Sequence, residues 1–109
     1  MPFELFQSEK TGKFHFRLKA RNGETILQSE AYNQKASAQN GIKSVISNAA
    51  PDRFESRKAK DGRDYFVLKA KNGEIIGKSQ MYKSRSGISN GMKSVIKNAS
   101  EAVVRDKTI

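Results

Sequence analysis

Few residues of this chain have side chains suited to catalysis. His15 is the only histidine, and the sequence contains no cysteine. A single imidazole without a thiol supplies too few groups for a nucleophile–base triad or a histidine-based metal site. Glu24 and Glu74 each follow a similar turn, where a cross-strand ion pair accounts for a carboxylate better than acid–base chemistry does. We therefore expect no catalytic, cofactor-binding or metal-binding residue, and we predict that the protein is not an enzyme.

The basic residues suggest a different chemistry, the binding of polyanions. Lys and Arg number 21 against 11 Asp and Glu, which gives a formal net charge of +10. Such a surface attracts polyanions such as nucleic acid. The same charge also keeps a small protein soluble without any specific partner. Charge alone therefore leaves both interpretations open.

The chain repeats most of its pattern at a spacing of 50 residues. LKARNGETI at 18–26 returns as LKAKNGEII at 68–76, and NGIKSVISNA at 40–49 returns as NGMKSVIKNA at 90–99. A unit of about fifty residues buries too small a fraction of its surface to offset chain entropy comfortably. We therefore predict that the two copies share one core. The predicted organisation is a single composite domain over 1–109, with repeat one at 1–50, repeat two at 51–100 and a C-terminal tail at 101–109.

Each repeat predicts three strands followed by a helix. Apolar and polar residues alternate in the second strand, which is typical of a half-buried strand. Later in each repeat, apolar residues recur at helical spacing and form one amphipathic stripe. The predicted strands are 3–6, 14–20 and 24–29 in repeat one and 54–57, 65–70 and 74–79 in repeat two, and the predicted helices cover 38–49 and 88–99.

Local residue choices set the turns and helix ends. The Asn-Gly pairs at 22–23 and 72–73 predict two-residue type I′ turns, in which both central residues take positive φ. Ser84 is a candidate cap for the second helix. Gly41 and Gly91 lie inside the helices, where glycine costs about 1 kcal/mol relative to alanine. A repeated cost predicts a repeated benefit, which we expect to be close approach of each helix to the sheet.

The predicted fold class is α+β. Two tandem β-β-β-α repeats form one antiparallel sheet of about six strands, with both helices packed on one face and a pseudo-twofold axis between the repeats. Val103-Val104-Arg105 falls where Arg53-Phe54-Glu55 stands one repeat earlier. The tail then adds a short strand, covers an edge or frays.

The outer face of this sheet carries the candidate site. Arg17, Lys19, Tyr65, Val67 and Lys69 are expected there, beside the single histidine. Basic groups interleaved with rings on an open sheet suit single-stranded nucleic acid. Alternatively, an apolar patch on this face serves self-association or another protein, or the face is simply solvated. The residues of that predicted patch are Leu27, Tyr65, Val67 and Ile75.

The repeated motifs resemble a known family. LKARNGE, SEAY, NGIKSV and NA in repeat one, matched by LKAKNGE, SQMY, NGMKSV and NA in repeat two, resemble the YegP-like family of small bacterial domains. The resemblance implies a three-strand-plus-helix unit, paired around one sheet with the helices exchanged between units, and it implies no activity. Gly77 in place of Leu27, and Gly87-Ile88 in place of Ser37-Ala38, are departures between the copies that we expect to affect packing.

The expected function is that of a small basic bacterial protein acting as a non-catalytic protein-interaction or structural module. The alternative is weak, sequence-nonspecific nucleic-acid binding. We expect another protein or a second copy as partner, no cofactor, no small molecule and no membrane, because no apolar run approaches spanning length. The N-terminal residues do not form a signal-peptide pattern, so we expect a cytoplasmic location.

Overall fold

The computed structural model describes residues 2–20, 23–101 and 103–108. The strands are β1 (Pro2–Gln7), β2 (Phe14–Lys19), β3 (Thr25–Gln28), β4 (Phe54–Lys58), β5 (Asp64–Lys69), β6 (Ile75–Lys78) and β7 (Val103–Asp106), and the helices are α1 (Lys35–Asn48), α2 (Arg85–Glu101) and the short 3₁₀ helix η1 (Pro51–Arg53). Each repeat thus contains the three strands and the helix that its sequence predicts.

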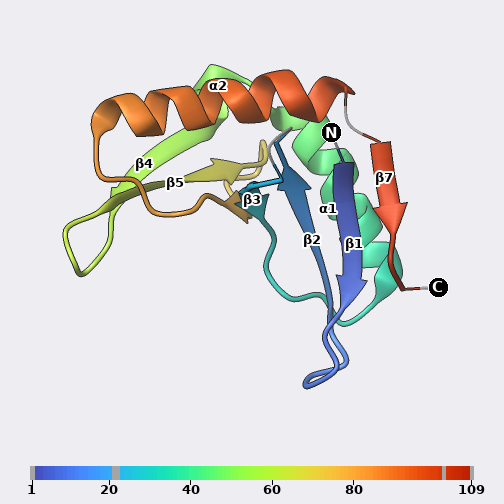
Figure 1. Ribbon diagram of the computed structural model, residues 1–109. Helices are drawn as coiled ribbons and strands as arrows, with labels where there is room; N and C mark the ends of the chain where they lie inside the picture. Colours follow the sequence, from blue (N-terminus) through green and yellow to red (C-terminus); the bar gives the residue numbers. More distant parts are fainter. Residues whose placement is uncertain (1, 21–22, 102, 109) are drawn as a thin grey trace.

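The strands form one mixed sheet in the order β4-β5-β6-β3-β2-β1-β7. The six strands of the two repeats are antiparallel to their neighbours, as predicted. The expectation of a wholly antiparallel sheet of about six strands needs one correction, because β7 adds a seventh strand that runs parallel to β1. Of the three outcomes predicted for the tail, the structure has the added strand (Figure 1).

The two repeats meet at a pseudo-twofold axis between β3 and β6. Gln28 pairs with Lys78 across this seam, and the two residues occupy the same position in their repeats. A residue that pairs with its own equivalent lies beside a twofold axis. On either side the strand order mirrors itself, so that β7 alone breaks the symmetry of the sheet.

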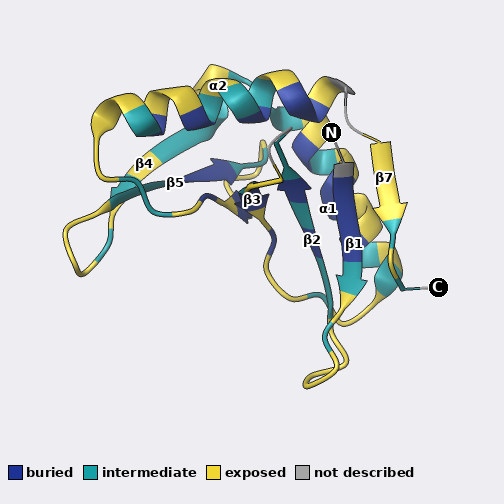
Figure 2. Cartoon of the chain, viewed as in Figure 1, coloured by how far each residue is buried: buried dark blue, intermediate teal, exposed yellow. Residues whose placement is uncertain are grey.

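Both helices cover the same face of the sheet, where the core lies. In Figure 1, α1 lies behind β1 and β2, and α2 runs across the top of the view. Each helix contacts strands of both repeats: α1 packs on β5 and β6 as well as on β1 and β2, and α2 packs on β2 and β3 as well as on β5. The core draws on both copies, and Figure 2 shows its buried residues on the strands and on the inner sides of the helices.

The two helical glycines allow this packing. A Cβ placed on Gly41 would lie 2.7 Å from a Phe16 ring carbon and 2.7 Å from the Tyr32 hydroxyl. Gly91 approaches the equivalent rings, Phe66 and Tyr82, in the same way. The predicted close approach of helix to sheet is confirmed. The predicted cap of α2 is also present, since the Gly87 N–H donates to Ser84 Oγ at 3.1 Å.

A β-bulge moves Leu27 from the predicted outer face to the core. The register between β2 and β3 shifts at Leu18/Lys19, so that Leu27 lies opposite Leu18 and Thr25 lies opposite Lys19. A bulge interrupts the alternation of side chains. Ile26 and Leu27 consequently both point inward, and Leu27 is 0 % exposed. Its predicted place in an outer apolar patch is wrong.

The second Asn-Gly turn has a different geometry from the prediction. Gly73 has φ +85°, but no non-glycine residue in the described ranges has positive φ, so Asn72 does not adopt a type I′ conformation. The Gly73 N–H donates to Ala70 C=O at 2.9 Å, and the Ala70 N–H donates to Glu74 C=O at 2.9 Å. These bonds define a three-residue loop that ends in a left-handed glycine. The first predicted turn includes Asn22, which lies outside the described residues.

Candidate interaction surface

The five predicted site residues all lie on the outer face of the sheet, in two separate groups. Arg17 and Lys19 project from β2, and Tyr65, Val67 and Lys69 project from β5. Strands β3 and β6 lie between β2 and β5. Three strand spacings correspond to about 14 Å. The structure therefore places the candidate residues on one face but does not assemble them into one compact site.

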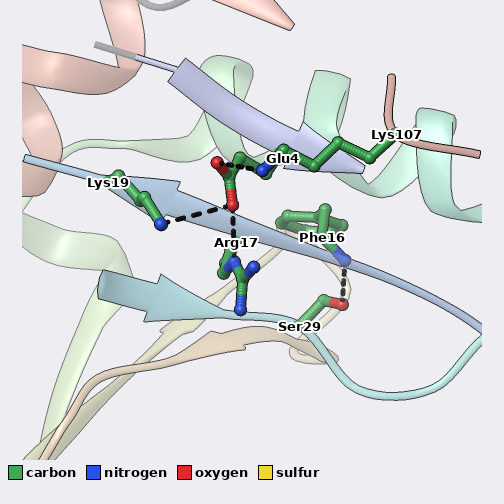
Figure 3. Close-up of polar contacts among 6 residues, drawn as sticks. All are labelled: Glu4, Phe16, Arg17, Lys19, Ser29 and Lys107. Atoms are coloured by element: carbon green, nitrogen blue, oxygen red, sulfur yellow. Dashed lines mark hydrogen bonds and ion pairs between the residues drawn. The ribbon is translucent and has the colours of Figure 1, made fainter. Parts of the chain in front are cut away.

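The first group is organised by a buried carboxylate, Glu4 on β1. Its Oε1 accepts a hydrogen bond from Arg17 Nε at 2.8 Å and lies 3.5 Å from Lys19 Nζ. Its Oε2 lies 3.0 Å from Lys107 Nζ, just beyond β7 (Figure 3). Glu4 is only 4 % exposed. Burial alone would raise its pKa, but the hydrogen bonds from Arg17 and Lys107 and the surrounding positive charge lower the pKa to about 2.

Aromatic rings extend this group along β1 and β2. The Arg17 guanidinium lies over the Phe6 ring, 4.6 Å from its centroid, and the Phe6 ring stacks on His15 at 5.4 Å between centroids. Cation–π contact and the bond to Glu4 together fix the orientation of the guanidinium. His15 Nδ1 is buried and makes no hydrogen bond within the described structure. The histidine therefore acts as a stacking partner in this arrangement.

Repeat two builds a similar group from different positions. Glu55 on β4 accepts from Arg57 Nε at 2.7 Å and lies 3.3 Å from Lys69 Nζ. Hydrogen bonds from these two cations lower the pKa of the Glu55 carboxyl. The arginine comes from the first strand here and from the second strand in repeat one. Each repeat thus holds a glutamate between an arginine and a lysine.

A groove lies on the outer face between these two groups, beside the pseudo-twofold axis. It has a volume of about 510 Å³, and its walls include Tyr65, Val67 and Ile75 with Arg57 and Lys78. Lys78 Nζ lies 4.7 Å from the Tyr65 ring centroid. Val67 is only 2 % exposed, so the ring and Ile75 provide most of the apolar contact surface. A second hollow of about 250 Å³ continues across the seam.

Two repeated serines hold the strands that frame the groove. Ser29 Oγ accepts from the Phe16 N–H at 2.9 Å and donates to Glu30 C=O at 2.8 Å. Ser79 makes the same pair of bonds with Phe66 and Gln80, at 2.9 and 2.8 Å. These buried hydroxyls replace part of the strand ladder at the point where each chain turns toward its helix. The presence of a serine at this position in both repeats therefore has a structural reason.

Several residues of this surface were missed by the sequence analysis. Glu4, Arg57 and Lys78 contact predicted site residues but were not assigned to the site. The Phe-Glu pairs at 3–4 and 54–55 were a usable signal, because a glutamate repeated in a strand requires cationic neighbours if it is buried. Across residues 2–20, 23–101 and 103–108, no cluster of three His, Asp or Glu side chains could hold a metal ion. In the same ranges no helix is long and apolar enough to cross a membrane.

Fold and surface together define a small two-repeat α+β protein with an uncovered, basic sheet face. The chain matches the family described as "Domain of unknown function (DUF1508)" over residues 9–55 and 59–106, and it belongs to that family. Each matched segment runs from the turn before the second strand, through the helix, to the strand after it. β4 and β7 are therefore the same element of successive units.

Solved structures of relatives have the same fold along nearly the whole chain. The solution structure of Escherichia coli yegP, a protein of unknown function, is 48 % identical and has a TM-score of 0.90, with coverage of 97 % of this chain and 91 % of that one. The UPF0339 protein SO3888 from Shewanella oneidensis is 46 % identical, with a TM-score of 0.89 and coverage of 97 % and 90 %. The resemblance to YegP-like proteins and the two-repeat fold are confirmed.

Sequence matches to curated relatives are shorter. The UPF0339 protein YegP of Escherichia coli K12 is 50 % identical over 60 residues, which is 54 % of each chain. The match to the UPF0339 protein in the ptx operon 5′ region of Stutzerimonas stutzeri is 49 % identical over 57 residues, or 50 % of that protein. The chain thus spans about half the length of the curated relatives that it matches. In the UPF0339 protein Atu0232 of Agrobacterium fabrum, 48 matched residues make up 76 % of the protein, about one repeat.

Proposed function

We propose that this protein is a non-catalytic interaction module that binds another protein through the outer face of its sheet. The groove beside the pseudo-twofold axis is the observation that carries the proposal. An aromatic ring and an aliphatic side chain, Tyr65 and Ile75, line it together with two cations, Arg57 and Lys78. Aromatic and arginine side chains are enriched where proteins bind one another. Both helices pack on the opposite face, so they leave this one open.

The fixed charges beside the groove support a specific partner. Arg17 is held by Glu4 and by the Phe6 ring, and Arg57 is held by Glu55. Side chains that are already ordered lose little conformational entropy when they bind. A partner that presents carboxylates or carbonyl groups at matching positions would meet donors that are already oriented.

Weak, sequence-nonspecific binding of nucleic acid is the second candidate. The observation that favours it is the ring of Tyr65 beside Lys78 on a basic sheet face, which suits a stacked base and its phosphate. The three predicted cations of this face are less favourable for binding phosphate, because Arg17, Lys19 and Lys69 already lie beside glutamates. Any such binding should weaken steeply with salt, with a log–log slope of about −0.7 per phosphate contact on single strands.

Site-specific photo-crosslinking in cells separates these functions. A benzophenone amino acid replaces Tyr65, and a control replaces Lys43, which is exposed on α1 away from the groove. The proposal predicts a discrete protein adduct from position 65 and none from position 43. A nucleic-acid adduct at position 65 would favour the second candidate. Equal labelling from both positions, or none at position 65, would contradict both.

We also propose a cytoplasmic location for the protein. The absence of cysteine is compatible with a reducing compartment, where disulfides are rare. Fractionation of cells that express the tagged chain tests this directly, and recovery in a membrane or periplasmic fraction would contradict it.

A further inference from the structure

The edge strand β4 directs backbone hydrogen-bonding groups away from the sheet. β4 ends the strand order on one side, and Ser56 lies opposite Phe66 of β5. Phe66 turns its own groups toward Ser79: its N–H donates to Ser79 Oγ, and its C=O accepts from the Ser79 N–H, each at 2.9 Å. In an antiparallel pair, the residue opposite such a position directs its groups the other way. The Ser56 N–H and C=O therefore face the free edge.

At the opposite edge of the sheet, an equivalent strand, β1, pairs with an added strand. Leu5 of β1 lies opposite Phe16, as Ser56 lies opposite Phe66, and its C=O accepts from the Lys107 N–H at 2.8 Å. β7 lies parallel to β1 there. Asp106 of β7 also contacts the first residue of α1, with Lys35 Nζ 2.5 Å from its Oδ2. One edge is thus occupied by backbone pairing together with two charge contacts, that of Asp106 with Lys35 and that of Lys107 with Glu4.

The β4 edge repeats the receiving half of that arrangement. Arg85, the first residue of α2, stands where Lys35 stands in repeat one. A hollow of about 520 Å³ lies between β4 and α2, with Ile88 and Met92 among its apolar lining residues. Met92 remains partly exposed, whereas its repeat-one equivalent Ile42 is only 3 % exposed.

The cations around this hollow indicate the chemistry of an occupant. Arg57, Lys58 and Arg85 line it. Arg57 is bound to Glu55, and Lys58 Nζ lies 3.6 Å from Asp64, so Arg85 is the cation that an occupant would match. Among the described residues no carboxylate pairs with Arg85. A cation in the first turn opposes the helix dipole. An incoming carboxylate would relieve that repulsion, as Asp106 does for Lys35.

We propose that the β4 edge binds an extended segment of another protein, which adds as a strand parallel to β4 and places a carboxylate on Arg85. This is a second site, which shares Arg57 with the outer-face groove but does not depend on the function proposed there. The β1–β7 register sets Val104 beside Phe3 and Asp106 beside Leu5. The equivalent occupant places an apolar residue beside Phe54 and an acid beside Ser56. Strand addition of this kind gains affinity from the backbone and specificity from alternate side chains.

The existing pairing of β7 favours another protein over a second copy of this chain. The chain's own β7 has the apolar and acidic residues at the required spacing, but it already pairs with β1. A second copy could supply its β7 only by giving up that pairing and the contacts of Asp106 with Lys35 and of Lys107 with Glu4. A segment of another protein loses no such contacts.

A peptide titration of the full ¹⁵N-labelled chain tests the proposal. The probe is a blocked octapeptide, Ala-Val-Val-Gln-Asp-Gln-Thr-Ile, in which two glutamines replace the cations of the β7 sequence, so that the aspartate is its one charge. We expect amide shift changes at 54–58 and at Arg85, without changes at 2–7. Replacing the peptide's aspartate by asparagine should weaken binding about fivefold, the effect of one partly exposed ion pair. Arg85→Gln should weaken binding of the aspartate peptide equally and leave binding of the asparagine peptide unchanged.

Ser56→Pro tests the backbone pairing, with Ser56→Ala as its matched control. Proline removes the outward N–H but leaves the β4–β5 ladder intact, and edge strands tolerate it at such positions. We expect loss of peptide binding in Ser56→Pro and normal binding in Ser56→Ala. If Ser56→Pro does not give the dispersed amide spectrum of the parent, a peptide N-methylated on its strand-pairing amides replaces it, and that peptide should not bind.

Several results would overturn the proposal. They are an absence of shifts at millimolar peptide, shifts centred on 2–7 or on the outer face, and unchanged binding to Ser56→Pro. Self-association of the free chain in sedimentation velocity, lost in Ser56→Pro, would also overturn it, because the occupant of the edge would then be a second copy. Crosslinking at Tyr65 is measured independently of this titration, so the two proposals fail separately.

Discussion

A double-mutant cycle at the pseudo-twofold axis tests how two similar repeats share one core. Leu27 and Gly77 occupy equivalent positions, and the leucine fills the space where the two would meet. A Cβ added to Gly77 would lie 2.7 Å from Leu27 Cγ and from Cδ2. Leu27 is fully buried and has little room to move. Gly77→Ala should therefore destabilise the protein by about 1–3 kcal/mol, the usual cost of overpacking a core.

The same structure predicts that the cost disappears once the leucine is removed. Leu27→Ala alone leaves a cavity and should cost about 2–5 kcal/mol. In Leu27→Ala/Gly77→Ala the new methyl group enters the vacated space, and alanine loses about 0.5–1 kcal/mol less conformational entropy than glycine on folding. The second substitution should then be neutral or stabilising. The expected coupling between the two sites is about 2 kcal/mol.

Urea unfolding followed by circular dichroism measures each corner of the cycle, provided that the m-values agree. Leu27→Ala combined with Gly91→Ala is the matched control, because a Cβ on Gly91 meets Tyr82 and Phe66 rather than Leu27. That pair should be additive. Additivity within about 0.5 kcal/mol at Leu27 and Gly77 would refute the idea that the two compete for one space.

Two further stability predictions follow from the structure. The Glu4 pKa falls from 4.5 to about 2 on folding, so its ionised form stabilises the protein above pH 4.5, and this contribution is lost as the pH falls toward 2. Glu4→Gln should lower the free energy of unfolding near pH 7 by up to about 3 kcal/mol and remove this part of the acid dependence, and urea midpoints between pH 2 and 7 that fall in parallel with the parent would argue against this. Gly91→Ala should destabilise by about 1–3 kcal/mol, although the same change in an exposed helix stabilises by about 1 kcal/mol, and a higher melting temperature in calorimetry would contradict the close packing on Tyr82.

The sequence predicts the elements of this fold well because their signals are local. Alternation over 14–20 reports a half-buried strand without reference to the rest of the chain, and helical spacing over 38–49 reports one packed face. Gly41 and Gly91 were informative because a costly residue repeated at one position requires a reason. The duplication then supplied the symmetry, since equivalent strands must occupy equivalent places.

The errors arose where long-range pairing decides the geometry. Leu27 was placed outside because strict alternation was assumed, and the bulge depends on how β3 pairs with β2. The Asn72 turn was assigned from a dipeptide preference, although the loop length is set by the hydrogen bonds around it. The parallel pairing of β7 with β1 joins residues about a hundred positions apart, and no local pattern indicates it.

The candidate surface was predicted in part for the same reason. Alternation along a strand predicts the face of the sheet on which each side chain lies, and Arg17 and Lys19 do lie on the predicted outer face. Their shared partner Glu4 is also contacted by Lys107, from beyond β7. Which charged side chains of a surface remain unpaired therefore depends on tertiary contacts that the sequence does not reveal.

The shared core is the central claim, and residues 1–50 expressed alone test it most directly. In the whole chain, α1 packs on strands of both repeats. As a dilute monomer, the fragment should show neither a cooperative melt nor dispersed amide signals, and mixing it with residues 51–109 should restore both. A cooperative melt with dispersed signals from the isolated fragment would contradict the account.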